Sequence, residues 1–499
     1  MTELVIKTKY GRVEGFVKNG LSRWYGIPYA KPPVGNLRFR RAVECESWTD
    51  IKNCTEFASP CYQFKSFFPN GKKNSENCLT LNIWRQNNDK KNLPVMLYIH
   101  GGYLHNNSGN DKSFHGDNVA NEGVLYISIN YRLGPLGCYD FSIYNKEAFD
   151  SNCTLSDQIM ALKWVNDNIQ AFGGDPQNIT IMGESAGGAS VLALMTSPAA
   201  KGLFQKAICQ SGYPDGEHFP NSNKLLVDMF LKYLKISPKE IELLRDMNIE
   251  KLVSANHYVF KNLSRYPGIY WPNFVYDDLL PEDCYYTLKN GSADGVKLIL
   301  GTNKNESTFF ALTREIPLSK AKIKTMFDNN NMSDQFPDVD EFYFKKHNRS
   351  NLNSCLDFGT DHMFLMGSIK FADIHSQRND VWMYRFDYEP PLLKAVGVKA
   401  THGIDIFISL KTMDPLGRLI WTICKPSSKC LLEQYMFNSF VTFAKTGNPN
   451  GDHLNLQWEK YNTESRKTFL IDKEPSLVDN PNKEKIDFWK TLKTQQFYK

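Results

Sequence analysis

Apolar residues along the chain fall into two kinds of segment. Uninterrupted apolar runs of strand length, each followed by glycine or polar residues, are typical of strands that are buried on both faces. Such runs predict strands over residues 95–99, 124–129, 179–182, 206–209, 296–300 and 381–386. Longer segments with apolar residues at spacings of three and four are typical of helices. Strand-like and helix-like segments alternate through much of the chain.

The clearest helical pattern covers residues 155–172 and stops at Gly173-Gly174-Asp175-Pro176. Its apolar positions are Leu155, Ile159, Leu162, Val165, Ile169 and Phe172. A second helix of small and apolar residues is predicted after the 179–182 strand, reaching Met195. Buried strands that alternate with helices predict an α/β fold, with a central, mostly parallel twisted sheet flanked by helices.

Two segments, at about 224–283 and 312–376, are rich in helical patterns and lack strand signals. We expect them to be insertions that form a helical cap above the C-terminal edge of the sheet, where open α/β sheets bind ligands. No repeat, low-complexity tract or linker divides the chain. Residues 1–499 are therefore predicted to form a single domain, although 499 residues exceed the usual domain size.

Composition and charge exclude several classes of protein. Hydrophobic residues make up 41% of the chain and aromatic residues 13%, which excludes a disordered protein. The net charge of +5 comes from 59 basic and 54 acidic residues that are mixed along the chain, so no nucleic-acid partner is predicted. No apolar stretch approaches the ~20 residues of a transmembrane helix. Residues 1–9 lack a hydrophobic signal core, and a soluble protein is expected, with secreted and cytoplasmic locations both open.

The cysteines do not predict a metal site. Their number, 11, is odd, so at least one thiol is unpaired within a monomer. Their spacing fits no zinc motif, and we expect neither a metal nor a cofactor. Asn-x-Ser/Thr acceptors, such as Asn53 and Asn106, make a glycoprotein only slightly more favoured.

The strongest chemical signal is Gly183-x-Ser185-x-Gly187, which stands between a predicted strand and a predicted helix. A nucleophilic serine at a sharp strand-to-helix turn needs glycines on both sides, where side chains would clash. The helix N-terminus also directs amide groups at developing negative charge. Because the pattern alone is common, its structural context favours a nucleophile over an ordinary turn serine.

Ester hydrolysis also needs an oxyanion hole. In a fold of this kind, one donor is the residue after the nucleophile, here Ala186, and others come from a glycine-rich turn after an early strand. The turn His100-Gly101-Gly102-Tyr103 follows the 95–99 strand and lies where this second part belongs.

The remaining catalytic partners should follow in the order acid, then histidine, on loops after later strands. Glu306 follows the 296–300 strand, and its position distinguishes it from an ordinary solvated glutamate. Only His402 and His453 lie beyond the 381–386 strand. His453 lies in a polar turn after Gly451-Asp452, which makes His402 the better candidate.

Several motifs together resemble the type-B carboxylesterases, the carboxylesterase/cholinesterase family, over nearly the whole chain. They are Thr8-Lys9-Tyr10-Gly11-Arg12-Val13, the run from Gly26 to Phe39, Ser75-Glu76-Asn77-Cys78-Leu79-Thr80-Leu81-Asn82, the run from Asn130 to Gly137, Asp157-Gln158, the run from Phe172 to Gly188, and the run from Phe443 to Pro449.

The resemblance implies an α/β-hydrolase fold, a triad of Ser185, Glu306 and His402, and a carboxylic-ester hydrolase that acts on small-molecule esters and is inhibited by organophosphates. It also implies further residues with supporting roles. These are Gly102, Tyr103 and Ala186 in the oxyanion hole, Asp405, Ser211 and Glu184 around the triad, a Cys61–Cys78 disulfide, and the ion pairs Arg38–Glu76 and Arg132–Asp157.

Two features depart from the family pattern. Tyr103 replaces a small residue, so we expect its ring to line the pocket and to alter the preferred acyl size. Further candidates for the lining of this pocket are Leu104, Phe309, Phe310 and the stretch Trp271 to Tyr276. The 61–78 loop contains no tryptophan, which argues against a cholinesterase, because a cholinesterase holds choline against such a ring. The remaining pattern is most similar to invertebrate carboxylesterases, including detoxification, hormone and pheromone esterases.

Two other functions remain open at this stage. Adhesion proteins share this scaffold without catalysis, although they typically lack the nucleophile that is present here. A sequestering protein with an intact triad and slow turnover would bind esters stoichiometrically. A monomer or a weak homodimer is expected.

Overall fold

The computed structural model describes residues 3–63, 73–214, 220–263, 273–313, 316–346 and 350–493. Its main feature is a mixed sheet with the strand order β14-β13-β12-β11-β10-β9-β7-β8-β6-β4-β3. In chain order these strands are β3 (Phe16–Lys18), β4 (Leu21–Pro28), β6 (Thr80–Gln86), β7 (Leu93–Ile99), β8 (Leu125–Ile129), β9 (Gly174–Glu184), β10 (Lys206–Gln210), β11 (Lys297–Asn303), β12 (Val381–Phe386), β13 (Thr468–Ile471) and β14 (Ser476–Val478).

The centre of this sheet is parallel and its edges are antiparallel. Strands β8, β7, β9, β10, β11, β12 and β13 pair in parallel, in that order. Strand β14 pairs antiparallel at one edge, and β6, β4 and β3 do so at the other. A small separate sheet contains β1 (Val5–Lys7), β2 (Arg12–Glu14) and β5 (Ile51–Asn53). The parallel centre confirms the predicted fold class. The N-terminal antiparallel strands β3, β4 and β6 were not predicted from the sequence.

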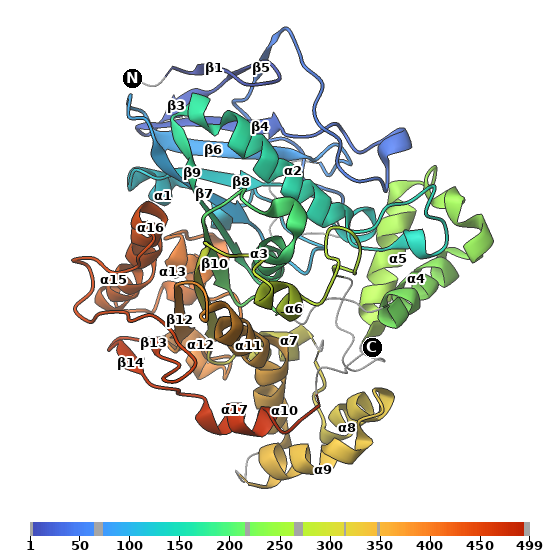
Figure 1. The fold of residues 1–499 in the computed structure, drawn as a ribbon, viewed down its shortest axis with the longest axis vertical. Helices are drawn as coiled ribbons and strands as arrows, with labels where there is room; N and C mark the ends of the chain where they lie inside the picture. The colour runs from blue at the N-terminus through green and yellow to red at the C-terminus, as the bar shows by residue number, and fades with distance from the viewer. Residues whose placement is uncertain are drawn as a thin grey trace.

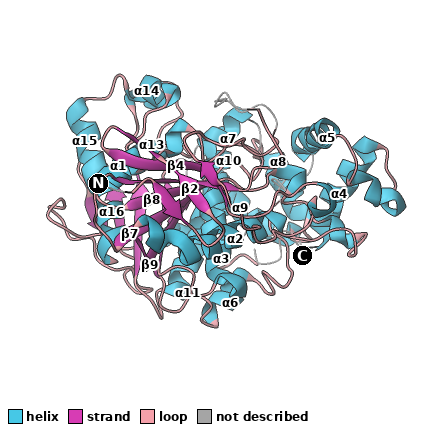
Figure 2. Cartoon of the chain, turned by 90° about the horizontal axis from the view of Figure 1, so that it is seen from above, coloured by secondary structure: helices cyan, strands magenta, loops and turns pink. Residues whose placement is uncertain are grey.

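Helices surround the sheet, as Figure 2 shows. They are α1 (Asp117–Asn121), α2 (Cys153–Asn168), α3 (Ala186–Thr196), α4 (Pro220–Leu234), α5 (Ile249–Asn262), α6 (Cys284–Lys289), α7 (Ser307–Thr313), α8 (Lys320–Asn329), α9 (Phe336–Val339), α10 (Asn351–Thr360), α11 (Met366–His375), α12 (Pro391–Ala395), α13 (Ile406–Ser409), α14 (Pro415–Trp421), α15 (Pro426–Tyr435), α16 (Phe437–Thr446) and α17 (Lys483–Trp489).

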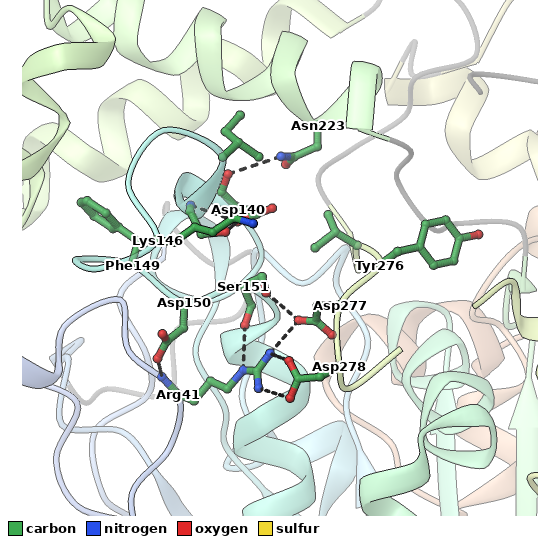
Figure 3. A pocket seen from close by; sticks show the side chains of 13 residues that line it. Arg41, Asp140, Lys146, Phe149, Asp150, Ser151, Asn223, Tyr276, Asp277 and Asp278 are labelled. Carbon is green, nitrogen blue, oxygen red and sulfur yellow. Dashed lines mark hydrogen bonds and ion pairs between the residues drawn. The ribbon is translucent and has the colours of Figure 1, made fainter. Parts of the chain in front are cut away.

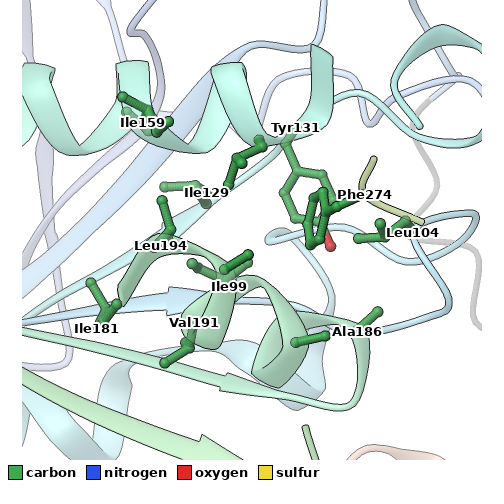
Figure 4. Close-up of a cluster of buried hydrophobic side chains, with 14 of the residues drawn as sticks. Ile99, Leu104, Ile129, Tyr131, Ile159, Ile181, Ala186, Val191, Leu194 and Phe274 are labelled. Atoms are coloured by element: carbon green, nitrogen blue, oxygen red, sulfur yellow. The ribbon is translucent and has the colours of Figure 1, made fainter. Parts of the chain in front are cut away.

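Alternate residues of the central strands supply two cores, because successive side chains of a strand point to opposite faces. On one face, strand residues such as Ile99, Ile129 and Ile181 pack under α2 and α3. Figure 4 shows Val191 and Leu194 of α3 beside these strand residues. On the other face, larger strand side chains pack against α1 and the helices α13 to α16. This second set includes Met96, Tyr98, Tyr126, Met182, Trp382 and Tyr384.

The predicted insertions are mainly helical in their described parts. Helices α4 and α5 pack together and stand to one side of the sheet in Figure 1. The second insertion begins at the end of α7 and contains α8 to α11, and α8 and α9 lie at the lower end of the molecule in the same view. Among the described helices, none is both long enough and apolar enough to cross a bilayer.

Candidate active site

Ser185 stands at the sharp turn between β9 and α3, with φ 57° and ψ −123°. An L-residue rarely adopts this backbone conformation, and it persists only where the surroundings enforce it. The neighbouring glycines do so by close packing. A Cβ on Gly183 would lie 2.3 Å from the Gly187 carbonyl oxygen, and one on Gly187 would lie 2.0 Å from the Ile99 carbonyl oxygen. The sequence pattern therefore has a steric cause, and the turn presents the serine hydroxyl at the end of the sheet.

Three side chains that are far apart in the sequence form a continuous hydrogen-bonded relay. The Ser185 hydroxyl lies 2.8 Å from Nε2 of His402, and Nδ1 of His402 lies 2.6 Å from Oε2 of Glu306. Glu306 follows β11, and His402 lies on the loop between α12 and α13. These lengths allow the imidazole to accept the serine proton at one nitrogen while the carboxylate fixes the other.

Glu306 is fully buried and is held at its second oxygen. Oε1 accepts hydrogen bonds from the Ser211 hydroxyl and from the Asn303 amide, each at 2.6 Å. Its carboxylate therefore has a fixed orientation toward His402. The resemblance had suggested Ser211 for a supporting role, whereas the backbone donor of Asn303 was not anticipated.

Glu184 supplies a second carboxylate beside the histidine. Its Oε1 lies 3.4 Å from Nε2 of His402. Burial raises the pKa of the Glu184 carboxyl to about 8. Burial lowers the pKa of His402, but the charges of Glu184 and Glu306 outweigh it, so the net direction is upward. The two shifts are linked, since protonation of Glu184 removes one of the charges that favour the imidazolium.

Asp405 forms no hydrogen bond with His402 among the described residues, but it supports the loop that carries His402. Its carboxylate accepts hydrogen bonds from Gln210, at 2.8 Å, and from Asn303 and Tyr384, each at 3.1 Å. Burial raises the pKa of this carboxyl. Sequence reasoning missed the three donors, which come from three different strands and have no motif of their own.

The glycine-rich turn lies against the nucleophile. A Cβ on Gly101 would stand 3.1 Å from Cβ of Ser185, so the turn and the elbow are in direct contact. Gly102, Tyr103 and Leu104 all have positive φ, at 101°, 60° and 56°. This unusual run curls the backbone at the predicted oxyanion hole. Ala186 is the first residue of α3, where a backbone amide has no intrahelical partner.

Aromatic rings pack around the histidine. Phe310 and Phe364 each have ring centroids 4.9 Å from that of His402, and Phe309 lies at 6.2 Å. Tyr103 packs edge-to-face on Phe310, with centroids 6.0 Å apart. These rings give the site a largely apolar wall. Sequence reasoning anticipated Phe309 and Phe310 but not Phe364.

Other predicted pocket residues have different positions. Leu104 is fully buried and packs within the main hydrophobic core. His453, the second histidine candidate, has a different partner from His402. Its Nε2 lies 2.9 Å from the Ser439 hydroxyl. Trp271 and the phenylalanines of the 61–78 loop lie outside the described residues.

The implied structural contacts are present, with one exception. Arg132 and Asp157 form a fully buried bidentate pair, at 2.8 and 2.6 Å, and Arg38 pairs with Glu76 through two contacts. The exception is the expected Cys61–Cys78 disulfide, because both residues are buried free thiols in this structure. Burial and the neighbouring Cys61 thiol raise the pKa of the Cys78 thiol. The two cysteines are therefore neighbours without a bond.

A polar pocket of about 520 Å³ lies elsewhere, between the loop before α2, the start of α4 and residues 275–278. Figure 3 shows Arg41 at the lower side of this pocket, bonded to Asp277 and Asp278. No residue of the Ser185–His402–Glu306 relay lines it. Its lining carries four aspartates and two basic side chains, Arg41 and Lys146.

Comparisons with known proteins agree along the whole chain. The model of the Carboxylesterase family matches residues 2–489. The chain is 34% identical to para-nitrobenzyl esterase of Bacillus subtilis over 494 residues, covering 97% of this chain and 98% of the other. It is 30% identical to carboxylesterase 5A of Felis catus, covering 94% and 89%. A solved PNB esterase structure superposes with a TM-score of 0.87 at 32% identity, covering 98% and 99%. These bacterial and mammalian relatives give no support to the expected invertebrate affinity.

Proposed function

The chain belongs to the carboxylesterase family and is a hydrolase of carboxylic esters, and from this premise we propose that Ser185, His402 and Glu306 perform the reaction. The observation that carries the proposal is the relay itself, with 2.8 Å from serine to histidine and 2.6 Å from histidine to glutamate. Burial of the relay supports it further, because electrostatic interactions are stronger away from water.

The reaction proceeds by two acyl transfers. His402 Nε2 takes the proton of Ser185 while Oγ bonds to the ester carbonyl carbon, and the carbonyl oxygen becomes an oxyanion. Backbone amides of Gly102, Tyr103 and Ala186 stabilise this oxyanion. The imidazolium then gives its proton to the departing alkoxide, and an alcohol leaves. Water repeats the sequence on the acyl-serine, with His402 as base, and the carboxylic acid is released.

Small esters with an aromatic or alkyl group are the proposed substrates. The rings around His402 form an apolar wall that suits such groups, and they leave little room beside Tyr103. A p-nitrobenzyl ester is a natural first choice, because one similar protein carries that name. We further propose that residues 1–499 form one domain and that the reaction needs no cofactor. Organophosphates should inhibit the enzyme covalently, and the protein should be a monomer or a weak homodimer.

Steady-state hydrolysis of p-nitrophenyl acetate and butyrate tests the proposal. We expect Ser185→Ala to lose at least about a thousandfold in kcat, because the nucleophile is absent. The exposed Ser427 provides a matched control, and Ser427→Ala should retain full turnover. Organophosphate treatment should add one phosphyl group to the wild type, detected by intact mass, and none to Ser185→Ala.

Two results would overturn this assignment. Full turnover by Ser185→Ala would exclude Ser185 as nucleophile. A single burst of product followed by no turnover in the wild type would instead favour the sequestering function, with Tyr103 weakening the oxyanion hole.

A further inference from the structure

Helix α14 has apolar side chains on two faces. Gly417, Ile420 and Trp421 are buried, and Gly417 lies directly against the Phe407 ring. The opposite side carries Leu416, Leu419 and Ile423, with exposed fractions of 41%, 61% and 62%. Their spacings of three and four place them on one face of the helix and its following turn. Packing against the protein explains the first face only.

A fourth exposed side chain extends this apolar surface. Val396 follows α12 and is 64% exposed, and α12 packs against α14. We call Leu416, Leu419, Ile423 and Val396 the α14 face. Figure 2 shows α14 at the outer edge of the molecule, beyond α13 and away from α4 and α5. Single exposed apolar residues are common, whereas adjacent ones indicate contact with another surface.

The exposed charges close to α14 in the sequence are mostly basic. Residues 390–432 contain two acidic residues, Asp405 and Asp414, and both are buried. The same stretch contains six basic residues, Lys394, Lys399, Lys411, Arg418, Lys425 and Lys429. Three of these pair with Glu389 or Glu433 at its ends. The other three, Lys399, Arg418 and Lys425, have no ion pair among the residues described by the structure.

We propose that the α14 face docks onto an anionic lipid surface. Exposed leucine, isoleucine and valine side chains partition into the boundary between headgroups and acyl chains, and surrounding lysine and arginine are attracted to acidic headgroups. A second copy of this chain is a poorer occupant, because a twofold interface would bring the two basic rims together. Charge complementarity therefore favours an anionic lipid surface over a second copy of this chain.

The α14 face is connected to the catalytic loops. The Asn305 amide donates to the Ala400 carbonyl at 2.9 Å, and the Thr308 hydroxyl donates to the Val398 carbonyl at 2.7 Å. These bonds join the segment after α12 to the loop that carries Glu306. The segment that begins at Val396 is thus linked directly to the loops that carry Glu306 and His402.

Co-sedimentation with vesicles tests the proposal on the full chain. The probes are vesicles of equal parts phosphatidylglycerol and phosphatidylcholine, and vesicles of phosphatidylcholine alone. We expect binding to the anionic vesicles at low salt, at least about tenfold weaker binding to the neutral ones, and weaker binding in high salt. Leu419→Asp/Ile423→Asp and Arg418→Glu/Lys425→Glu should each lower anionic-vesicle binding by about tenfold or more.

Matched controls separate docking from folding and catalysis. Leu243 is 57% exposed on another segment, Pro238–Leu244, so Leu243→Asp should bind vesicles like the wild type. The three surface variants, Leu419→Asp/Ile423→Asp, Arg418→Glu/Lys425→Glu and Leu243→Asp, should hydrolyse a dissolved p-nitrophenyl ester at the wild-type rate, which reports on folding. The inactive Ser185→Ala variant should still bind vesicles.

Three results would overturn the proposal. The first is a wild-type protein that fails to bind anionic vesicles. The second is binding of the α14-face variants to these vesicles that equals wild-type binding. The third is a wild-type dimer in sedimentation velocity that Leu419→Asp dissociates, which would identify a second copy as the occupant.

Discussion

Replacing Glu306 by glutamine isolates the role of the acid in the relay. Oε1 of Glu306 accepts hydrogen bonds from the Asn303 amide and the Ser211 hydroxyl. A backbone amide can only donate, so the carbonyl oxygen of glutamine must take the Oε1 position. The NH₂ group then replaces Oε2, 2.6 Å from Nδ1 of His402, and it must donate to that nitrogen.

The expected result is a histidine in the wrong tautomer. With Nδ1 accepting, Nε2 carries the hydrogen and faces the Ser185 hydroxyl across 2.8 Å, where it cannot take the serine proton. The equivalent change of acid to amide in a serine protease costs about 10⁴-fold in kcat. We expect a loss of about 10³–10⁴-fold here, which corresponds to roughly 4–5.5 kcal/mol of barrier.

Steady-state hydrolysis of p-nitrophenyl butyrate measures the effect, with urea unfolding as a control for stability. The volume and the bonds at Oε1 are retained, so Glu306→Gln should unfold near the wild-type midpoint. Covalent labelling by an organophosphate should slow in parallel with turnover, because both need an activated Ser185. A stable Glu306→Gln enzyme with turnover within tenfold of wild type would refute the tautomer argument.

Three further changes test other parts of the site. Glu184→Gln removes a negative charge that favours the His402 imidazolium, so the acidic limb of the kcat/KM profile should move to lower pH by roughly one to two pH units; an unmoved limb would contradict this. Asp157→Asn leaves the Arg132 guanidinium buried without its counter-charge, and urea titration should show a loss of about 3–5 kcal/mol in the free energy of unfolding, whereas a loss below about 1 kcal/mol would count against it. Tyr103→Ala keeps the amide but removes the ring, so the ratio of octanoate to acetate kcat/KM should rise about tenfold or more, and an unchanged ratio would place the ring outside the acyl pocket.

The sequence predicted the parts of the fold that local pattern determines. Strand β12 has the predicted bounds, because its apolar run is clearly delimited. Strand β9 starts earlier than predicted, at Gly174, because the Asp175-Pro176 turn signals masked a pairing with β7. Strand β4 was missed, although six of its eight residues are buried, because Ser22, Arg23 and Gly26 interrupt its apolar run. The position of β4 in the sheet depends on antiparallel pairing with β6, residues 80–86.

The candidate site divides in the same way. Strand order alone pointed to Glu306 and His402, because each follows a recognisable strand in the expected sequence. Phe364 touches His402 but lies in the second helical insertion, where nothing in the local pattern distinguishes it from other buried residues. Long-range packing therefore determines which rings surround His402, whereas sequence motifs and strand order indicate which residues carry out the reaction.

The backbone at Ser185 illustrates a tension between stability and activity. A non-glycine residue with φ 57° costs of order 1–3 kcal/mol, which is a noticeable part of the stability of a typical domain. Glycine at the same position would relax that strain and abolish the nucleophile at once. The most strained point of the elbow is thus the residue on which turnover depends, and the surrounding core compensates for a local conformation that stability alone would not select.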